Sequence, residues 1–208
     1  MITTEAQARS FSAERCDERG LERIERFIEQ LRDENSRQNL VSSASLDHVW
    51  QRHIADSLQI LDHVPRETGT WLDLGSGAGL PGLVVALARP EQSIILVESR
   101  KRRIEWLRAN ISQFGLTNCS VEGSRLENVE TRQVSIITAR AFAPLGKLMD
   151  LSTRFSTRST LWVLPKGRSA AQELAEQPPY VRAMFHVEQS RTDPEAAILV
   201  GQGRPSRT

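Results

Sequence analysis

The sequence predicts an α/β fold in which helices surround a mostly parallel sheet of seven strands. Between residues 70 and 164, short apolar runs alternate with helix-like segments, and the runs are continuously apolar. Strands that are buried on both faces of a parallel sheet have this composition. The last two apolar segments, 181–189 and 195–203, are joined by the short sequence SRTDP, which is typical of an antiparallel hairpin. We therefore expect the sheet to end in a hairpin.

The order of the elements follows from the apolar spacing. Strands are expected at short apolar runs bounded by turn residues, and helices where apolar residues recur every three or four positions. The expected strands are 70–75, 93–98, 118–123, 134–139 and 160–165, and the expected helices between them are 80–89, 101–115 and 145–155. Most neighbouring strands are thus connected by a helix, as the crossovers of a parallel sheet require.

Two helices are expected before the sheet. Residues 14–37 carry apolar side chains at a helical spacing, and a second helix should follow Ser45 and end before Pro65. We interpret residues 1–66 as a helical extension packed on a core domain of residues 67–203, followed by a mobile tail at 204–208.

Composition restricts the class of protein. The 208 residues carry a net charge of +1, and no apolar run approaches the ~20 residues that a membrane helix needs. The N-terminus lacks the pattern of a secretory signal. Cys16, expected in the first helix, and Cys119, expected in a strand, form no metal-binding spacing with each other or with the four histidines. We expect a cytoplasmic protein with reduced cysteines, no metal and no membrane partner.

A cluster of basic residues lies just after the second expected strand. Five of the nine residues from 100 to 108 are basic, namely Arg100, Lys101, Arg102, Arg103 and Arg108. Such a run can be an ordinary solvated helix face or a surface that contacts phosphates, and the sequence leaves both interpretations open.

The stretch WLDLGSGAGLPG, residues 71–82, places four glycines directly after a buried strand. A strand, a glycine-rich turn and a helix form a nucleotide-binding cradle, because missing side chains let backbone N–H groups approach the ligand. In one interpretation Gly77, Gly79 and Gly82 form the dinucleotide fingerprint G-x-G-x-x-G. A protein that binds NAD is therefore one candidate.

The second interpretation begins earlier, with Asp73 and Gly75 opening the pattern D-x-G-x-G-x-G. Position favours it, because the expected strand ends at Leu74 or Gly75. Pro81 is then the first residue of the next helix, where its missing N–H has no cost. About 20 residues later, Glu98 ends the next strand, where an acid can accept both hydroxyls of a ribose. An ordinary surface glutamate is the alternative, and the ribose is common to both ligand classes.

An acid two residues before the first glycine resembles the first motif of class I S-adenosylmethionine-dependent methyltransferases. Seven segments over residues 20–200 together resemble the bacterial 16S ribosomal RNA guanine-N7 methyltransferases, the small-subunit methyltransferase G family, also called glucose-inhibited division protein B. These segments are QNLVS, RHIADSL, LDLGSGAGLPG, LVES with KRRIEWLR, GSRLE, ITARAFAPL and LPKG. The resemblance implies a Rossmann-like methyltransferase fold, S-adenosylmethionine as cofactor, and methylation of guanosine 527 in the 530 loop of 16S rRNA.

The resemblance also assigns cofactor-binding residues. The loop residues would hold the cofactor, the segment after the third strand would pack against its adenine, and an arginine after the fourth strand would lie beside it. In this sequence those positions are Asp73, Gly75, Gly77, Gly79, Leu80, Leu126, Glu127 and Arg140. The family usually has Asp where this chain has Glu98, so the contact with the ribose can shift slightly.

Methylation of guanine N7 needs no general base, because N7 carries a lone pair and no hydrogen. The enzyme must only align N7 with the methyl group, and Arg140 is the expected positioning residue. Pyrimidine C5 methylation would need a cysteine nucleophile, and neither Cys16 nor Cys119 is placed for it. The sequence QPPY at 177–180 is similar to a motif of amino-group methyltransferases, but its position favours a plain loop.

Basic residues at strand ends are the candidates for RNA binding. Arg125, Arg140 and Lys166 each follow an expected strand, so they should lie at the same edge of the sheet. Arg52 and His53 are further candidates. The alternatives are an ion pair of Arg140 with Glu127 or Asp73, an ion pair of Arg52 with Asp56, and a core position for His53.

The substrate is expected to be 16S rRNA or the 30S subunit, and the enzyme a monomer. A methyltransferase of the same fold that acts on another RNA, a small molecule or a protein remains the alternative. The arginines at the edge of the sheet favour RNA.

Overall fold

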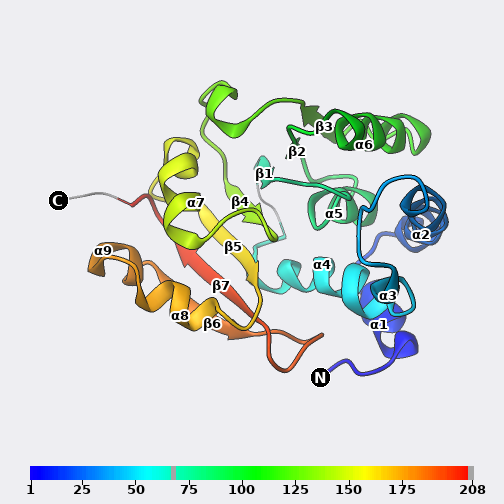
Figure 1. Cartoon of the computed structure of the whole chain (residues 1–208), viewed down its shortest axis with the longest axis horizontal. Coiled ribbons are helices and arrows are strands. Elements are labelled where there is room, and N and C mark those ends of the chain that lie inside the picture. The colour runs from blue at the N-terminus through cyan, green and yellow to red at the C-terminus, as the bar shows by residue number, and fades with distance from the viewer. Residues whose placement is uncertain (67–68, 206–208) are drawn as a thin grey trace.

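The computed structural model describes residues 1–66 and 69–205, and it contains the expected α/β sheet (Figure 1). The strand order is β3-β2-β1-β4-β5-β7-β6. All pairs are parallel except those of β7, which runs antiparallel to β5 and β6. The strands are β1 (Trp71–Leu74), β2 (Ile94–Val97), β3 (Cys119–Glu122), β4 (Ile136–Ala139), β5 (Leu161–Lys166), β6 (Phe185–Gln189) and β7 (Ala197–Gln202). The predicted sheet and hairpin are confirmed.

The central strands are buried on both faces, which explains their continuously apolar sequences. In β1, Trp71 and Leu72 are both fully buried but belong to different core clusters, because successive side chains point to opposite faces. One cluster includes α2 (Gly20–Asn35) and α5 (Gly82–Ala88), and the other includes α7 (Leu145–Ser152). Helices therefore cover both faces of the sheet.

The N-terminal segment differs from the expected helix at 14–37. It forms α1 (Glu5–Ala13), which was not predicted, and then α2, with Cys16 between the two helices and not within one. A Cβ atom on Gly20 would lie 2.8 Å from the Cβ of Cys16, so the chain enters α2 through a tight turn. The apolar spacing that predicted a helix begins only at Leu21, which is why it located α2 but not the turn before it.

The expected second helix is present but irregular. It consists of α3 (Ser43–Leu46), the π-helical η1 (Trp50–Ala55), α4 (Asp56–Leu58) and the 3₁₀ turn η2 (Gln59–His63). A π-helical turn is rare and often occurs at functional sites. Among the described residues, no helix is both long enough and apolar enough to cross a membrane.

Several boundaries after β1 correct the predictions. Pro81 is the N-cap of α5, which begins at Gly82 and not at Pro81. The sequence at 177–180 is not a plain loop, because α9 (Pro179–Arg182) begins inside it with proline at its first position. The remaining helices are α6 (Lys101–Gln113), η3 (Leu126–Asn128), η4 (Thr153–Phe155) and α8 (Ala170–Ala175). Of the expected mobile tail, residues 206–208 lie outside the described residues.

Candidate active site

Two cavities lie at the carboxyl ends of the parallel strands and share two lining residues, which we call the wall. The small cavity, of about 250 Å³, is lined by Gly75, Val97, Glu98, Ser99, Arg100, Arg103, Ser124, Arg125 and Leu126. The large cavity, of about 810 Å³, is lined by residues from five separate segments, including Arg52, His53, Arg140 and Lys166. Ala141 and Phe142 line both cavities. The two cavities are therefore adjacent.

The glycine loop forms one side of the small cavity. Gly75, Gly77 and Gly79 have φ angles of +69°, +55° and +98°, in the region that favours glycine. A Cβ atom on Gly75 would lie 2.6 Å from the ring of Phe142, so the loop and the wall are in close contact. The loop starts directly after Leu74, the last residue of β1, as the D-x-G-x-G-x-G interpretation requires.

Glu98 connects this loop to the start of α6. Its Oε2 accepts a hydrogen bond from the Gly77 amide at 3.0 Å, and its Oε1 accepts from the amides of Ser99 and Arg100 at 2.7 and 2.8 Å. A carboxylate offers about four lone-pair positions, so about one remains for a ligand. Glu98 can therefore accept one ribose hydroxyl while it holds the loop, which is fewer than the two that the sequence suggested.

Asp73 lies beneath the loop and is completely buried. Its Oδ2 accepts the Gly82 amide at 3.3 Å, while its Oδ1 has no hydrogen-bond partner among the described residues. Burial raises the pKa of Asp73 from 3.8 to about 6. A buried carboxylate oxygen without a partner is costly, and a cationic or hydrogen-bonding ligand would offset that cost. Together with the glycine loop and Glu98, this oxygen fits an adenosyl cofactor with a charged amino-acid end.

The segment after β3 forms the other side of the small cavity. Leu126 is buried and lines it, as expected for an adenine contact, whereas Glu127 is exposed and outside the lining. Arg125 lines this cavity too, although it was predicted as an RNA contact. Gly77, Gly79 and Leu80 support the loop without lining either cavity.

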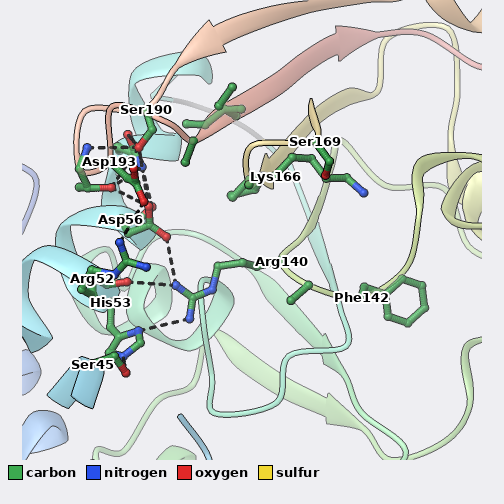
Figure 2. A pocket seen from close by; sticks show the side chains of 18 of the residues that line it. Ser45, Arg52, His53, Asp56, Arg140, Phe142, Lys166, Ser169, Ser190 and Asp193 are labelled. Atoms are coloured by element: carbon green, nitrogen blue, oxygen red, sulfur yellow. Dashed lines mark hydrogen bonds and ion pairs between the residues drawn. The ribbon is translucent and has the colours of Figure 1, made fainter. Parts of the chain in front are cut away.

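Arg140 lines only the large cavity, where three groups of the η1–α4 segment hold it (Figure 2). Its Nη1 donates to Asp56 Oδ2 at 3.0 Å and to the carbonyl of Arg52 at 3.3 Å, and its Nη2 lies 3.5 Å from His53 Nδ1. The alternative of an ion pair for Arg140 is confirmed, but its partner is Asp56 and not Glu127 or Asp73. Asp56 approaches from the N-terminal segment, a contact that strand order alone does not reveal.

His53 is both a core residue and part of the cavity lining. Its side chain is buried, and Nε2 lies 2.8 Å from the hydroxyl of Ser45. Burial, with Arg140 and Arg52 nearby, lowers the pKa of His53 from 6.5 to about 3. The ring is therefore neutral at physiological pH, and its Nδ1 can accept a hydrogen bond from Arg140.

The other cations of the large cavity have carboxylate partners as well. Arg52 pairs with Asp193 at 2.9 Å and not with Asp56, which was the alternative interpretation, because the loop between β6 and β7 approaches η1. Lys166 pairs with Glu173 of α8 at 2.8 Å and also donates to the Ala143 carbonyl. These acids were missed, because nothing in their local sequence indicates which cation they meet.

Asp56 has further contacts beyond Arg140. Its Oδ1 accepts from the Thr192 hydroxyl at 2.8 Å and from the Gln59 amide at 2.8 Å. It thus connects the N-terminal segment, the end of β4 and the loop before β7. Within residues 1–66 and 69–205, no group of three His, Cys, Asp or Glu side chains is arranged to hold a metal ion.

Comparison with known proteins identifies the family. The sequence profile of GidB, rRNA small subunit methyltransferase G, matches residues 20–193. The chain belongs to this family. It is 64% identical to "Ribosomal RNA small subunit methyltransferase G" of Erythrobacter litoralis, over 98% of this chain and 99% of that one. It is 55% identical to the protein of that name from Sphingopyxis alaskensis, over 87% and 78% of the two chains.

Solved structures share the fold at low sequence identity. A methyltransferase from Geobacter sulfurreducens superimposes with a TM-score of 0.61 at 11% identity, covering 85% of this chain and 88% of that one. A SAM-dependent methyltransferase from Aquifex aeolicus gives a TM-score of 0.56 at 13% identity, covering 79% and 95%. The predicted class I methyltransferase fold, the family and the activity of an rRNA methyltransferase are confirmed. S-adenosylmethionine is the methyl donor of this class.

Proposed function

We propose that the protein transfers a methyl group from S-adenosylmethionine in the small cavity to N7 of a guanine of 16S rRNA in the large cavity. The observation that carries this proposal is the shared wall, Ala141 and Phe142, between the two cavities at the end of the sheet. A methyl donor and a methyl acceptor must lie close together, and these cavities are adjacent.

The small cavity suits the donor. Glu98 would accept a ribose hydroxyl, Leu126 would pack against the adenine, and the backbone at Gly75 would approach the ligand closely because no side chain covers it. The unpartnered Oδ1 of Asp73 would face the methionine end. When bound, the cofactor supplies the electrophilic methyl group, and the protein supplies its orientation.

The large cavity suits a purine that needs positioning and no proton transfer. His53 is neutral and hydrogen-bonded, and Arg140 is fixed by Asp56, so neither is poised as a general base. N7 methylation needs none. Arg140 would contact the guanine directly, and Lys166 and Arg52 would direct the surrounding RNA. In this proposal, the N-terminal segment, residues 1–66, is an extension that completes the acceptor cavity.

We further propose that the 16S rRNA is already part of a 30S subunit or its precursor when it is methylated. The enzyme would act on this particle as a cytoplasmic monomer. The basic residues at the start of α6, of which Arg100 and Arg103 line the small cavity, would contact RNA phosphates beside the cofactor.

The test is methylation of unmodified 30S subunits, naked 16S rRNA and 23S rRNA with labelled S-adenosylmethionine. Strand cleavage specific for 7-methylguanine then locates the product. We expect label at one guanine of 16S rRNA. Label only in 23S rRNA or in ribosomal protein, or label in 16S rRNA without cleavage at a guanine, would refute the proposed acceptor. Binding of NAD in place of S-adenosylmethionine would refute the proposed donor.

A further inference from the structure

The large cavity is electrically balanced. Each of its three cations forms an ion pair with a carboxylate that also lines the cavity: Arg52 with Asp193, Arg140 with Asp56, and Lys166 with Glu173. The only other titratable side chain among the described lining residues is His53, which is neutral at physiological pH. The cavity therefore carries no net charge, although it belongs to an enzyme whose substrate is a polyanion.

The small cavity has a different charge. It is lined by Arg100, Arg103 and Arg125 but by only one carboxylate, Glu98. None of these three arginines forms an ion pair with a carboxylate in the part of the chain that the structure describes. Arg100 and Arg125 are exposed, so solvent screens part of their charge. The small cavity is nevertheless the more positive of the two.

Methyl transfer to N7 moves a positive charge between the cavities. The N7 lone pair forms the new N–C bond, the S–C bond breaks, and its electron pair stays on sulfur. The sulfonium becomes a neutral thioether, and the purine becomes a cation. Positive charge thus leaves the more positive cavity and appears in the neutral one. A protein that presents the appropriate charges in advance stabilises such a transition state.

We propose that the three paired carboxylates, Asp56, Glu173 and Asp193, keep the acceptor cavity neutral so that the guanine ring can become positively charged during the reaction. The inference deepens the proposed function and rests on its N7 chemistry. Unpaired cations at these positions would repel the developing purine cation. Of the three, Asp56 should have the largest effect, because it neutralises Arg140, which three groups hold at the wall.

This role differs from a role in RNA binding. Free cations would attract RNA more strongly, so a cavity built for RNA affinity alone would not pair each of them with a carboxylate. Replacing one carboxylate with its amide removes the negative charge and nearly preserves the shape. The rate of methyl transfer should then fall while the affinity for RNA stays equal or rises, a combination that simple loss of structure would not produce.

The test compares Asp56→Asn, Glu173→Gln and Asp193→Asn with the wild type. Single-turnover rates are measured with saturating enzyme and S-adenosylmethionine on unmodified 30S subunits, and RNA affinity is measured separately over a range of salt concentrations. We expect Asp56→Asn to slow transfer by about tenfold or more while RNA affinity stays equal or rises. Asp56→Glu, which keeps the charge, should be faster than Asp56→Asn.

Asp62→Asn is the matched control. Asp62 has a similar side-chain exposure, 23% against 19% for Asp56, and it pairs with Arg15 and Arg191 outside the lining of both cavities. Asp62→Asn changes the net charge of the protein by the same amount as Asp56→Asn. Its rate of methyl transfer should nevertheless match that of the wild type. If Asp56→Asn fails to fold, the Glu173 and Asp193 variants decide the question.

Two results would overturn the inference: wild-type transfer rates in all folded amide variants, or a rate loss matched by an equal loss of RNA affinity. An equal slowing by Asp62→Asn would also overturn it, because the effect would then belong to the total charge of the protein. The proposed function fails separately, if the wild-type product is not 7-methylguanine. If that product forms and the variants keep the wild-type rate, only the present inference fails.

Discussion

The small cavity is built from segments close in sequence and depends on backbone, whereas the large cavity is built from distant segments and depends on paired side chains. The glycine loop and Glu98 follow β1 and β2, and their mutual contacts are main-chain amides donating to one carboxylate. The large cavity joins residues near 52, 140, 166 and 192 through side-chain contacts. On the proposed assignment, methyl-donor binding would need a fixed backbone shape, while the acceptor cavity would depend on charge balance between side chains.

The largest effect should come from filling the backbone cradle. In Gly75→Val, a β-branched side chain would meet the Phe142 ring at a residue with φ of +69°, so we expect cofactor affinity to fall at least about 100-fold. RNA affinity should fall much less, because the atoms nearest to the new side chain belong to Phe142, and none belongs to the paired cations of the large cavity. Calorimetry with S-adenosylmethionine and RNA-binding assays measure the two.

Gly115→Val is the control for this change. Gly115 has φ of +60°, but a Cβ atom there would meet nothing within 4 Å. Both variants should lose about 1–2 kcal/mol of stability through backbone strain. Equal cofactor affinity in the two would contradict the placement of the donor beside Gly75.

Removal of Arg140 should affect the large cavity more than the small one. We expect Arg140→Ala to lower turnover by about 100-fold or more, through loss of the group that positions the guanine. Cofactor affinity should fall by a smaller factor, because Arg140 does not line the small cavity. Arg132→Ala removes an ion pair with Glu122 outside both cavities and should keep wild-type turnover. If Arg140→Ala lowered cofactor affinity by as large a factor as turnover, Arg140 would belong to the donor site.

The wall between the cavities should have an intermediate effect. Phe142→Ala removes the ring that contacts the glycine loop and borders both cavities, so the donor and acceptor would be less well aligned. We expect a loss in single-turnover rate of about tenfold, and Phe142→Leu should recover part of it. Wild-type rates in the alanine variant would show that the ring has no part in alignment.

The last effect concerns stability and not the rate of transfer. Burial raises the pKa of Asp73 to about 6, from 3.8 in the unfolded chain, so between these values the folded state binds more protons than the unfolded state. The free energy of unfolding should therefore fall as the pH rises from about 4 to about 6. Asp73→Asn lacks this penalty, so it should be more stable than the wild type at pH 8, by up to about 3 kcal/mol.

Denaturant titrations at several pH values measure this difference, which should disappear below about pH 4. The same variant should bind S-adenosylmethionine more weakly, because it lacks the charge of the buried Oδ1. If the free energy of unfolding of Asp73→Asn followed the same pH dependence as that of the wild type, burial would not destabilise the charged form of Asp73.

The contrast between the cavities also explains what could be predicted from sequence. The seven strands and the position of the glycine loop were predictable, because apolar runs and glycine spacing are local signals. Glu98 was located correctly, but its three amide partners were not, because they appear only when β2 packs beside the loop. Because of these three contacts, Glu98 can accept one ribose hydroxyl and not the two that the sequence suggested.

The partners in the large cavity could not be predicted in this way. The spacing of Arg52 and Asp56 suggested an ion pair within one helix, but each of these side chains pairs with a residue that is distant in sequence. Asp56 instead meets Arg140, which is 84 residues away in sequence. Asp193 reaches Arg52 across 141 residues. Such pairs depend on tertiary packing, for which a single sequence carries no local signal.

A crystal structure of the protein with S-adenosylhomocysteine tests most directly whether the small cavity binds the methyl donor and the large cavity is left for the acceptor. We expect the adenosyl group between Glu98 and Leu126, with a ribose hydroxyl on Glu98 and the sulfur directed at the Ala141–Phe142 wall. Adenosyl density among Arg52, His53 and Lys166, with the small cavity holding only solvent, would contradict that arrangement.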